Sequence, residues 1–252
     1  MTDDNFDLTP PDLRREDLLI VDDPRFAEET TALVTGAASG IGQTTAVALA
    51  ANGLTVVGAD IDTDGMEETR ALADEVDADG RIESVETDLT DDEDVGAVVE
   101  AAADLGDLRY VANIAGMQHI DSIAEFPMEK YDLLQDIMVR SPFVTAQKAI
   151  PHIKETDDGV GAIANMSSVH GHYATERKPA YITAKHAITG LTRSIAAEGE
   201  GTLRGFSVSV GYVLTPLMVD QIEDTAEQRG LSKREVVEDV MLGQARTKEM
   251  MT

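Results

Sequence analysis

The sequence predicts an α/β protein with a doubly wound parallel sheet, and three observations lead to this fold class. Short apolar segments alternate regularly with longer helical segments over most of the chain. The apolar segments lack the alternation of a strand with one solvated face, so we expect strands that are covered on both faces. At 252 residues with 42% hydrophobic residues, the chain suits one large domain, and neither an internal repeat nor a second domain is visible.

The first predicted elements follow one another closely. Residues 31–35 are a short apolar strand, and residues 41–52 are an alanine-rich helix that ends at Gly53. A second strand at 54–59 precedes a helix at 64–76.

The same alternation continues to residue 210. A third strand at 81–87 leads to a helix at 91–103, and a fourth strand lies at 108–114. The remaining elements are helices at 128–153 and 180–197 and strands at 161–166 and 206–210.

Acidic residues dominate the charge. There are 48 acidic and 20 basic residues, which gives a net charge of −28. Nucleic acids and anionic membranes are therefore poor partners, and an acidic surface of this kind suits a salt-rich, halophilic cytoplasm. Residues 1–28 are an acidic arm with several prolines and no sustained periodicity, with room for one short helix, and we expect it to lie outside the core.

The residue types also exclude several kinds of site. The chain has no cysteine, which excludes disulfides, thiolate metal sites and cysteine nucleophiles. We expect no metal site, because His119, His152, His172 and His186 have no suitable ligands beside them in the sequence. No apolar run reaches membrane-spanning length and the start is acidic, so we expect a cytoplasmic protein.

A glycine-rich segment, Thr35-Gly-Ala-Ala-Ser-Gly-Ile-Gly42, joins the first strand to the first helix. Its glycines allow a tight turn and a close approach to a diphosphate, which the positive end of the helix attracts. Glycines can also simply mark a loop, but the strand–turn–helix context favours a Rossmann-like cofactor site. The expected cofactor contacts in this segment are Gly36, Ser39, Gly40, Ile41 and Gly42.

Asp60 follows the second strand, 24 residues after Gly36. A carboxylate at this place accepts hydrogen bonds from ribose hydroxyls and repels a 2′-phosphate, and no lysine or arginine lies beside it or in the glycine segment. We therefore expect NAD rather than NADP; the less favoured alternative is that Asp60 is one more surface acid in an acidic protein. Asp88 and Leu89 follow the third strand, where the adenine edge would lie.

Tyr181 and Lys185 are spaced by four residues, which places them on one face of a helix. Tyrosine ordinarily titrates near pH ~10, and a lysine ammonium together with a positively charged nicotinamide would favour its phenolate. Ser168 precedes them at a strand end and could hydrogen-bond the reacting oxygen. The spacing alone is common on surface helices, but after the glycine segment it indicates a catalytic group.

Taken together, these motifs resemble the short-chain dehydrogenase/reductase family from Thr31 to Thr252. The resemblance implies that Ser168, Tyr181 and Lys185 are catalytic, with Tyr181 and Lys185 also beside the cofactor. In the family, the segment Asn113-Ile-Ala-Gly116 and the segment Gly211-Tyr-Val-Leu-Thr215 contact the cofactor. The residues that this adds are Asn113, Ala115, Gly116, Val213 and Thr215.

Within the family, the sequence is most similar to bacterial D-3-hydroxybutyrate dehydrogenases. The segments around Gln118, Ser168, Lys178 and Gly211 resemble theirs. In that group, the matching positions hold the carboxylate of the substrate, and amide, imidazole and ammonium groups suit a small anion. The implied substrate residues are Gln118, His170, Lys178 and Gln221.

Three departures from the family pattern bear on activity rather than on fold. Met138 stands where the family has an asparagine that relays protons, and Val210 replaces a proline. The last helix and strand of the family have no counterpart before Thr252, so we expect the C-terminal strand of the sheet to be missing. Since that strand builds one family interface, we expect a homo-oligomer that is a dimer rather than a tetramer.

The sequence therefore predicts an NAD-dependent enzyme that interconverts 3-hydroxybutyrate, or a similar short 3-hydroxy acid, and its 3-oxo acid. Two alternatives remain at this point. The first is a non-catalytic or impaired NAD-binding relative, which Met138 favours. The second is a dehydrogenase of another alcohol, such as a sugar or steroid, which the small polar set of substrate residues disfavours.

Overall fold

The computed structural model describes residues 7–243 and 245–252, and these form two compact units. The larger unit contains residues 13–209, and the smaller one contains residues 210–252 with residues 7–12. Among the described residues, no helix is both long enough and apolar enough to cross a membrane.

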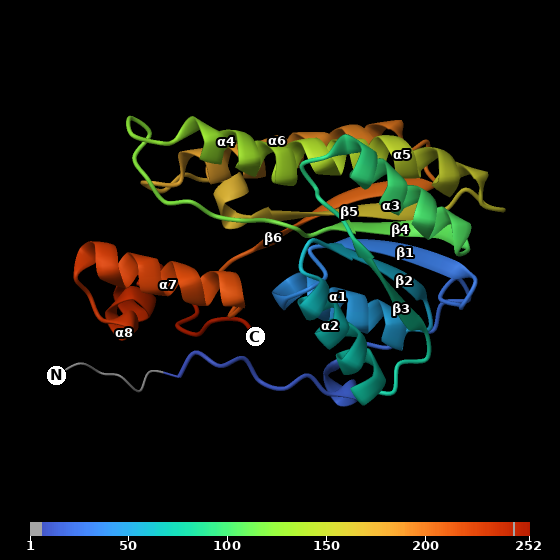
Figure 1. Ribbon diagram of the computed structural model, residues 1–252, viewed down its shortest axis with the longest axis horizontal. Coiled ribbons are helices and arrows are strands. Elements are labelled where there is room, and N and C mark those ends of the chain that lie inside the picture. The colour runs from blue at the N-terminus through green and yellow to red at the C-terminus, as the bar shows by residue number, and fades with distance from the viewer. Residues whose placement is uncertain (1–6, 244) are drawn as a thin grey trace. The chain divides into compact units, whose positions relative to one another are not determined.

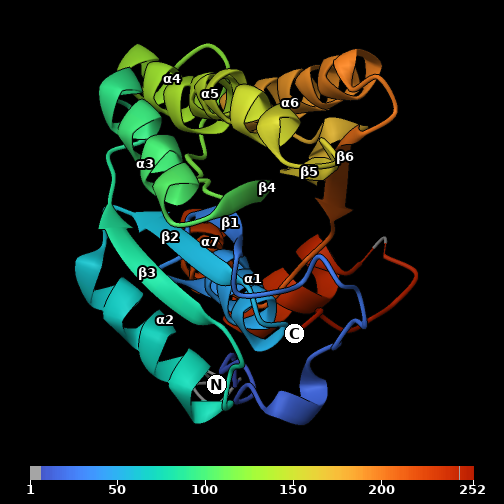
Figure 2. The ribbon, with the colours of Figure 1, turned by 90° about the vertical axis from the view of Figure 1, so that its right-hand side faces the viewer.

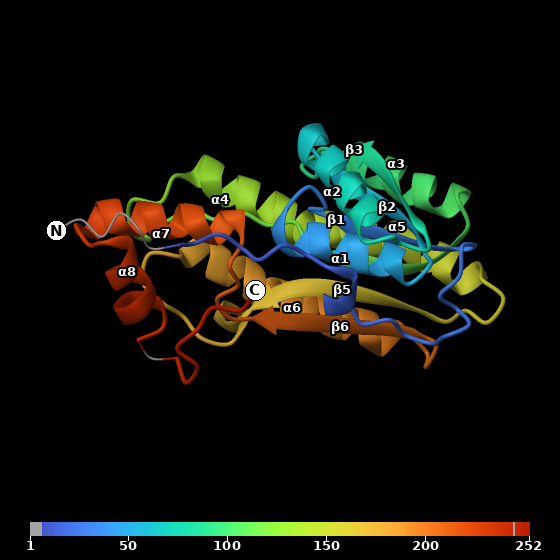
Figure 3. The ribbon, with the colours of Figure 1, turned by 90° about the horizontal axis from the view of Figure 1, so that it is seen from below.

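The larger unit is built on a six-stranded sheet in the order β3-β2-β1-β4-β5-β6. Helices cover both faces: α1 and α2 lie on one side, and α3 to α6 lie on the other (Figures 1 and 2). β6 runs beside β5 at one edge (Figure 3). The strands are β1 Thr30–Thr35, β2 Thr55–Asp60, β3 Arg81–Glu86, β4 Asp107–Asn113, β5 Gly161–Ser168 and β6 Leu203–Val210. The helices are α1 Gly40–Ala51, α2 Thr63–Glu75, α3 Asp92–Asp104, α4 Met128–Gln135, α5 Ser141–Glu155 and α6 Pro179–Glu198.

The predicted doubly wound, Rossmann-like fold is confirmed. β1 pairs in parallel with both β2 and β4, and Thr35 lies opposite Ala59 on one side and Asn113 on the other. The strand order therefore reverses between β1 and β4. In a doubly wound sheet, ligands bind outside the carboxyl ends of the strands at this reversal.

Each face of the sheet has its own core. Val34 and Val56 pack with Ala46 and Val47 of α1 in one cluster. Leu33 and its neighbours in β2 and β4 pack in a second cluster with α3, α5 and α6. All six residues of β1 are buried, which explains why this strand shows no alternation of polar and apolar residues.

The helix predicted at 128–153 is present but not regular. A π-helical turn, Asp136–Arg140, separates α4 from α5. Pro142 follows this turn and has no N–H to donate to the carbonyl of Met138, which accounts for the widened turn. Met138 thus lies in the irregular part of the helix.

The N-terminal arm differs from the expectation for residues 1–28, of which 1–6 lie outside the described residues. Leu13, Leu18 and Phe26 pack against the core cluster beside α1, so this part of the arm is not outside the core. Arg15 donates to the backbone carbonyls of Val76 and Asp77 after α2. Burial of these three apolar side chains favours contact between the acidic arm and the core.

The smaller unit contains helices that the sequence analysis did not assign. α7 spans Pro216–Arg229 and α8 spans Lys233–Glu235, followed by a π-helical turn at Val236–Met241. Their local signals are present in the sequence: Thr215 caps α7, and Ser232 with Glu235 forms a capping box. Ile222, Val236 and Leu242 form the buried centre of this unit.

Candidate active site

The glycine segment between β1 and α1 is closely packed. Gly36 has a φ of 71°, and its N–H donates to the carbonyl of Ala59 at 2.9 Å. A Cβ on Gly36 would lie 2.7 Å from the Cα of Ala115, and a Cβ on Gly42 would lie 1.8 Å from the carbonyl oxygen of Gly36. Both positions therefore require glycine, because a larger side chain would collide with backbone rather than with a movable side chain.

The amino end of α1 is open to an anion. Ser39 precedes the helix in an extended conformation, and its side chain makes no capping hydrogen bond. The first N–H groups of the helix, beginning at Gly40 and Ile41, thus have no side-chain cap from Ser39, and they carry the positive end of the helix dipole. The backbone turn at Gly36 and Gly42, which only glycine allows, and the free N–H groups at the start of α1 fit the diphosphate of a dinucleotide.

Asp60 lies at the end of β2, beside the glycine segment. Its Oδ2 accepts a hydrogen bond from the N–H of Ala38 at 3.1 Å, and its Oδ1 accepts one from the N–H of Asp62 at 3.1 Å. The carboxylate is half-exposed, so each oxygen retains capacity for a further donor. This arrangement fits a ribose that presents two hydroxyl groups.

Asp88 and Leu89 follow β3 and are both half-buried. The hydroxyl and the N–H of Thr90 donate to Asp88 at 2.7 and 2.8 Å, and these bonds lower the pKa of the carboxyl group. Asp88 is therefore a fixed anion at the same carboxyl edge of the sheet as Asp60.

Asn113 ends β4 and joins neighbouring elements by its side chain. Its amide donates to Oδ1 of Asn165 at 2.9 Å, and Asn165 donates to the hydroxyl of Thr192 on α6 at 2.9 Å. This buried chain ties β4 and β5 to the helix that carries Tyr181. Ala115 and Gly116 follow Asn113 in the segment that faces Gly36.

The fold brings Ser168, Tyr181 and Lys185 to one place. Ser168 is the last residue of β5, and Tyr181 and Lys185 lie one turn apart on α6. The Ser168 hydroxyl is near enough to Tyr181 to lower the pKa of the phenol, against the larger effect of burial. The Nζ of Lys185 lies 5.3 Å from the centre of the Tyr181 ring and donates to the carbonyl of Met166 at 2.8 Å.

Burial controls the ionisation of this group. It raises the pKa of Tyr181, and Ser168 offsets this in part. It also lowers the pKa of Lys185 to about 8. In the protein alone, the tyrosine is thus held in its protonated form. The depression of its pKa by a bound, positively charged nicotinamide, expected from the sequence, stays a prediction.

His170 lies against the same serine. Its Nδ1 is 3.3 Å from the Ser168 hydroxyl, and its Nε2 is 3.0 Å from the hydroxyl of Thr175. Burial, and next the charge of Lys178, lower the pKa of His170 to about 4. The ring is therefore neutral near neutral pH, and both of its nitrogens have hydroxyl partners. Sequence reasoning missed Thr175, whose signal was only an exposed threonine in the loop before α6.

Lys178 and Gln118 lie on two loops that are joined to each other. Lys178 is half-buried at the residue before α6, and burial lowers its pKa. The carbonyl of the preceding residue, Arg177, accepts a hydrogen bond from the N–H of Asp121 at 3.0 Å. Gln118 accepts a hydrogen bond from the N–H of His119 at 3.2 Å. The fold thus brings the Gln118 loop to the loop that carries Lys178.

Met138 occupies an apolar environment in this region. It is 2% exposed and packs with Leu134, Ala180 and Ala184. A Cβ on Gly116 would lie 3.5 Å from its sulfur and 3.9 Å from the Nζ of Lys185. The family's relay position is therefore filled here by a packed thioether, which neither donates a proton nor orders a water molecule.

The other three predicted residues belong to the smaller unit. The hydroxyl of Thr215 accepts a hydrogen bond from the N–H of Met218 at 3.3 Å and so caps α7. Val213 forms a parallel bridge with Met251, and Gln221 is buried on α7. Their roles toward cofactor and substrate stay predictions.

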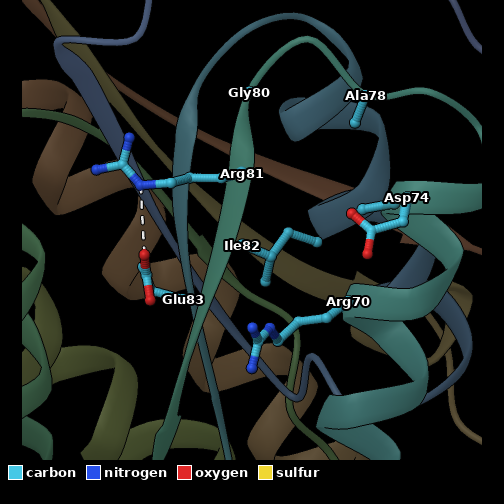
Figure 4. Close-up of a pocket in the computed structure, with 8 residues that line it drawn as sticks. Arg70, Asp74, Ala78, Gly80, Arg81, Ile82 and Glu83 are labelled. Atoms are coloured by element: carbon cyan, nitrogen blue, oxygen red, sulfur yellow. Dashed lines mark hydrogen bonds and ion pairs between the residues drawn. The ribbon is translucent and has the colours of Figure 1, made fainter.

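A cavity of about 180 Å³ lies elsewhere, between α2 and the first half of β3 (Figure 4). Arg70 and Asp74 line it from α2, and Arg81 lines it from β3, where it pairs with Glu83 at 3.3 Å. None of the predicted site residues lines it. It lies at the opposite end of β3 from Asp88, so it is no part of the site described above.

Comparisons with known proteins identify the family of this chain. A model of the short chain dehydrogenase family matches residues 30–226. The D-beta-hydroxybutyrate dehydrogenase of Rhizobium meliloti is 37% identical over 227 residues, which cover 88% of this chain and 86% of that protein. The enzyme of the same name from Cupriavidus necator is 35% identical over 216 residues, covering 82% and 81%.

Solved structures of similar fold include a reductase. The crystal structure of levodione reductase superposes with a TM-score of 0.82 at 25% identity, over 89% of this chain and 86% of that one. The resemblance expected from the sequence is confirmed in both respects. The chain belongs to the short-chain dehydrogenase family.

Proposed function

We propose that the protein is an NAD-dependent oxidoreductase that interconverts D-3-hydroxybutyrate, or a closely similar short 3-hydroxy acid, and its 3-oxo acid. The observation that carries the proposal is the Nζ of Lys185, which lies 5.3 Å from the centre of the Tyr181 ring, with Ser168 at the end of β5 and a half-buried ammonium at Lys178. Two relatives that carry the name of this activity, at 37% and 35% identity, support it.

The chain's residues divide the chemistry between them. When bound, an oxidised nicotinamide supplies the acceptor for the hydride. Tyr181 takes the proton from the substrate hydroxyl during oxidation and returns it during reduction. Ser168 donates to the reacting oxygen and so orients the carbonyl. Lys185, with its Nζ 5.3 Å from the tyrosine ring, favours the phenolate and would hold the ribose.

The choice of NAD is supported by charge. A 2′-phosphate would lie beside the Asp60 carboxylate, and the segment from Gly36 to Gly42 contains no cation to compensate. Asp88, whose pKa is lowered, is a second anion at the same edge of the sheet and would add to this repulsion. Ribose hydroxyls, by contrast, can donate to the Asp60 oxygens.

The choice of a short acid is supported by the polar groups around the tyrosine. The Lys178 ammonium is partly desolvated, and burial lowers its pKa. An ion pair between this ammonium and a substrate carboxylate would therefore stabilise the bound substrate. Gln118 can add an amide donor from the neighbouring loop. A neutral alcohol offers no anionic group that could pair with this ammonium.

The test is NADH formation in molar salt with D-3-hydroxybutyrate, its L enantiomer and the neutral alcohol 2-butanol. We expect turnover of the D acid alone, and loss of turnover with retained NAD binding in Tyr181→Phe. Preferred oxidation of 2-butanol would contradict the acid pocket and leave a dehydrogenase of another alcohol. NAD binding without turnover of any alcohol would instead indicate a non-catalytic relative.

A further inference from the structure

Two loops beside the candidate site are joined by Asp121 and Arg177. The β4–α4 loop contains residues 114–127, and the loop before α6 contains residues 172–178. The N–H of Asp121 donates to the carbonyl of Arg177 at 3.0 Å, and Nη2 of Arg177 lies 3.9 Å from Oδ1 of Asp121. One main-chain hydrogen bond and one ion pair thus connect the same two residues across the loops.

The backbone of Arg177 is left-handed, with a φ of 65°. This conformation is uncommon and strained for a residue that carries a Cβ. Among the described residues, two other non-glycine residues share it, Asp77 and Glu200, and each directly follows the capping residue at the end of a helix. Left-handed residues ordinarily end helices in this way. Arg177 ends no helix, because α6 begins after it, so its conformation has another cause.

The residue that follows this turn is Lys178, whose ammonium the proposed function places on the substrate carboxylate. Lys178 is the N-cap of α6, its carbonyl accepts from the N–H of Ile182 at 3.0 Å, and Pro179 follows it. The helix therefore fixes the backbone of Lys178 on one side, and the turn at Arg177 fixes it on the other. The ammonium is close enough to His170 for its charge to contribute to the lowered pKa of that ring.

We propose that Asp121 and Arg177 are positioning residues that hold the Lys178 ammonium in the direction from which it meets the substrate carboxylate. The hydrogen bond and the ion pair keep the two loops together, and the left-handed turn sets how the chain enters α6. The proposal rests on the proposed function, because that function assigns Lys178 to the carboxylate. Asp121 and Arg177 act through Lys178 and need no contact with the substrate.

The advantage of this arrangement is that the lysine is ordered before the substrate arrives. A lysine side chain has many rotamers, and a mobile loop adds further backbone states, so binding an anion would otherwise have to order both. Loosening the turn should therefore raise KM for the acid. It should change kcat little, because Ser168, Tyr181 and Lys185 lie on β5 and α6 rather than on the two loops.

The first test is Arg177→Gly, with Arg177→Asn as the conservative variant and Glu200→Gly as the matched control. Glycine adopts a positive φ without strain, so the fold is kept while the turn loses its restriction. Glu200 is also left-handed and exposed, and it pairs with Lys154 at 3.6 Å, but it lies beyond the opposite end of α6. We expect Arg177→Gly to raise KM for 3-hydroxybutyrate about five- to tenfold, with kcat nearly unchanged.

The two other variants should stay within about twofold of the wild type. Asparagine tolerates the left-handed region and restricts the backbone more than glycine does, so Arg177→Asn keeps the turn. The ion pair that it loses is exposed and contributes little by itself. Glu200→Gly removes a left-handed residue and an ion pair far from Lys178, so it reports what such a change does to the protein in general.

The second test asks whether Arg177 acts through Lys178. In the Lys178→Ala background, Arg177→Gly should cause no further loss in kcat/KM for the acid, because the group that it positions is gone. A turn with a general structural role would reduce kcat/KM by the same factor in both backgrounds. Equal factors, or an unchanged KM in Arg177→Gly alone, would overturn the proposal.

A third measurement needs no substrate and so separates this proposal from the proposed function. The rate at which a trace amine reagent labels Lys178 is followed against pH by mass spectrometry, with the exposed Lys148 as internal reference. Burial lowers the pKa of Lys178, and Arg177→Gly should move this pKa back toward its ordinary value, whereas Glu200→Gly should not. If 3-hydroxybutyrate is not turned over but this shift is present, the proposed substrate fails and the positioning of Lys178 stands. A Lys178 titration that Arg177→Gly leaves unchanged refutes the positioning whatever the substrate.

Discussion

Lys178→Ala is the substitution that most directly examines how the substrate is selected. Lys178 is half-buried beside α6, and burial lowers the pKa of its ammonium, so its charge is poorly compensated by solvent. The substrate carboxylate would replace the lost hydration. Removing the ammonium should therefore weaken the transition state for an acid and leave that for a neutral alcohol largely unaffected.

The magnitude follows from Coulomb's law. Two unit charges about 4 Å apart attract by ~4 kcal/mol at an effective dielectric constant of ~20, which suits a partly buried pair. Desolvation of the incoming carboxylate offsets part of this, and we take about half. The remaining ~2 kcal/mol corresponds to a loss of about 30-fold in kcat/KM for 3-hydroxybutyrate.

The assay is the initial rate of NADH formation with 3-hydroxybutyrate and with 2-butanol, with NAD affinity measured separately by calorimetry. Lys148→Ala is the matched control, because it removes the same charge from an exposed position on α5. In the wild type, kcat/KM for the acid should also fall as pH rises through the lowered pKa of Lys178, since only the charged form binds the anion. A loss below about threefold, or an equal loss with 2-butanol, would refute the reasoning.

Four further results are expected. NAD should bind at least about tenfold more tightly than NADP, a difference of about 1.4 kcal/mol that calorimetry can measure. Asp60→Ala should reduce this ratio, and equal affinities in the wild type would contradict the assignment of NAD. Met138→Asn should lower Tm, because an amide in an apolar cluster costs about 1–3 kcal/mol of stability. By restoring the family's relay group it should also raise kcat; an unchanged or lower kcat would mean that protons leave by another route. As pH falls from 6.5 to about 4, the free energy of unfolding should decrease more in the wild type than in His170→Gln. The reason is that the pKa of His170 is lowered to about 4 in the folded protein, so the unfolded chain binds the proton first. An equal decrease in both proteins, measured by denaturant unfolding at each pH, would refute this. Light scattering in high salt should give a dimer, and a stable tetramer would be the opposing result.

The sequence predicted most elements to within a few residues, and the exceptions have identifiable causes. The helix at 128–153 is interrupted by a π-helical turn because Pro142 removes one backbone donor, an effect that periodicity does not register. Helix α7 is absent from the predicted elements, although Thr215 and Pro216 mark its start and Gly230 its end. The prediction that the N-terminal arm lies outside the core is wrong for part of the arm. Its apolar residues are few among many acids, but Leu13, Leu18 and Phe26 pack on the core.

The sequence by itself determined the fold class, through the alternation of strands and helices along the chain. It also singled out the glycine segment and the candidate catalytic group, because each of these depends on a short spacing. Gly36 and Gly42 act within one turn, and Tyr181 and Lys185 lie one helical turn apart, so local geometry suffices to interpret them.

The tertiary structure alone decided how the environment sets the chemistry of these groups. Burial lowers the pKa of Lys185 to about 8 and that of His170 to about 4, which no spacing reveals. The apolar packing of Met138 against α6 likewise depends on which helices meet. Desolvation and hydrogen bonding are properties of the packed neighbours, and most of those neighbours are distant along the chain.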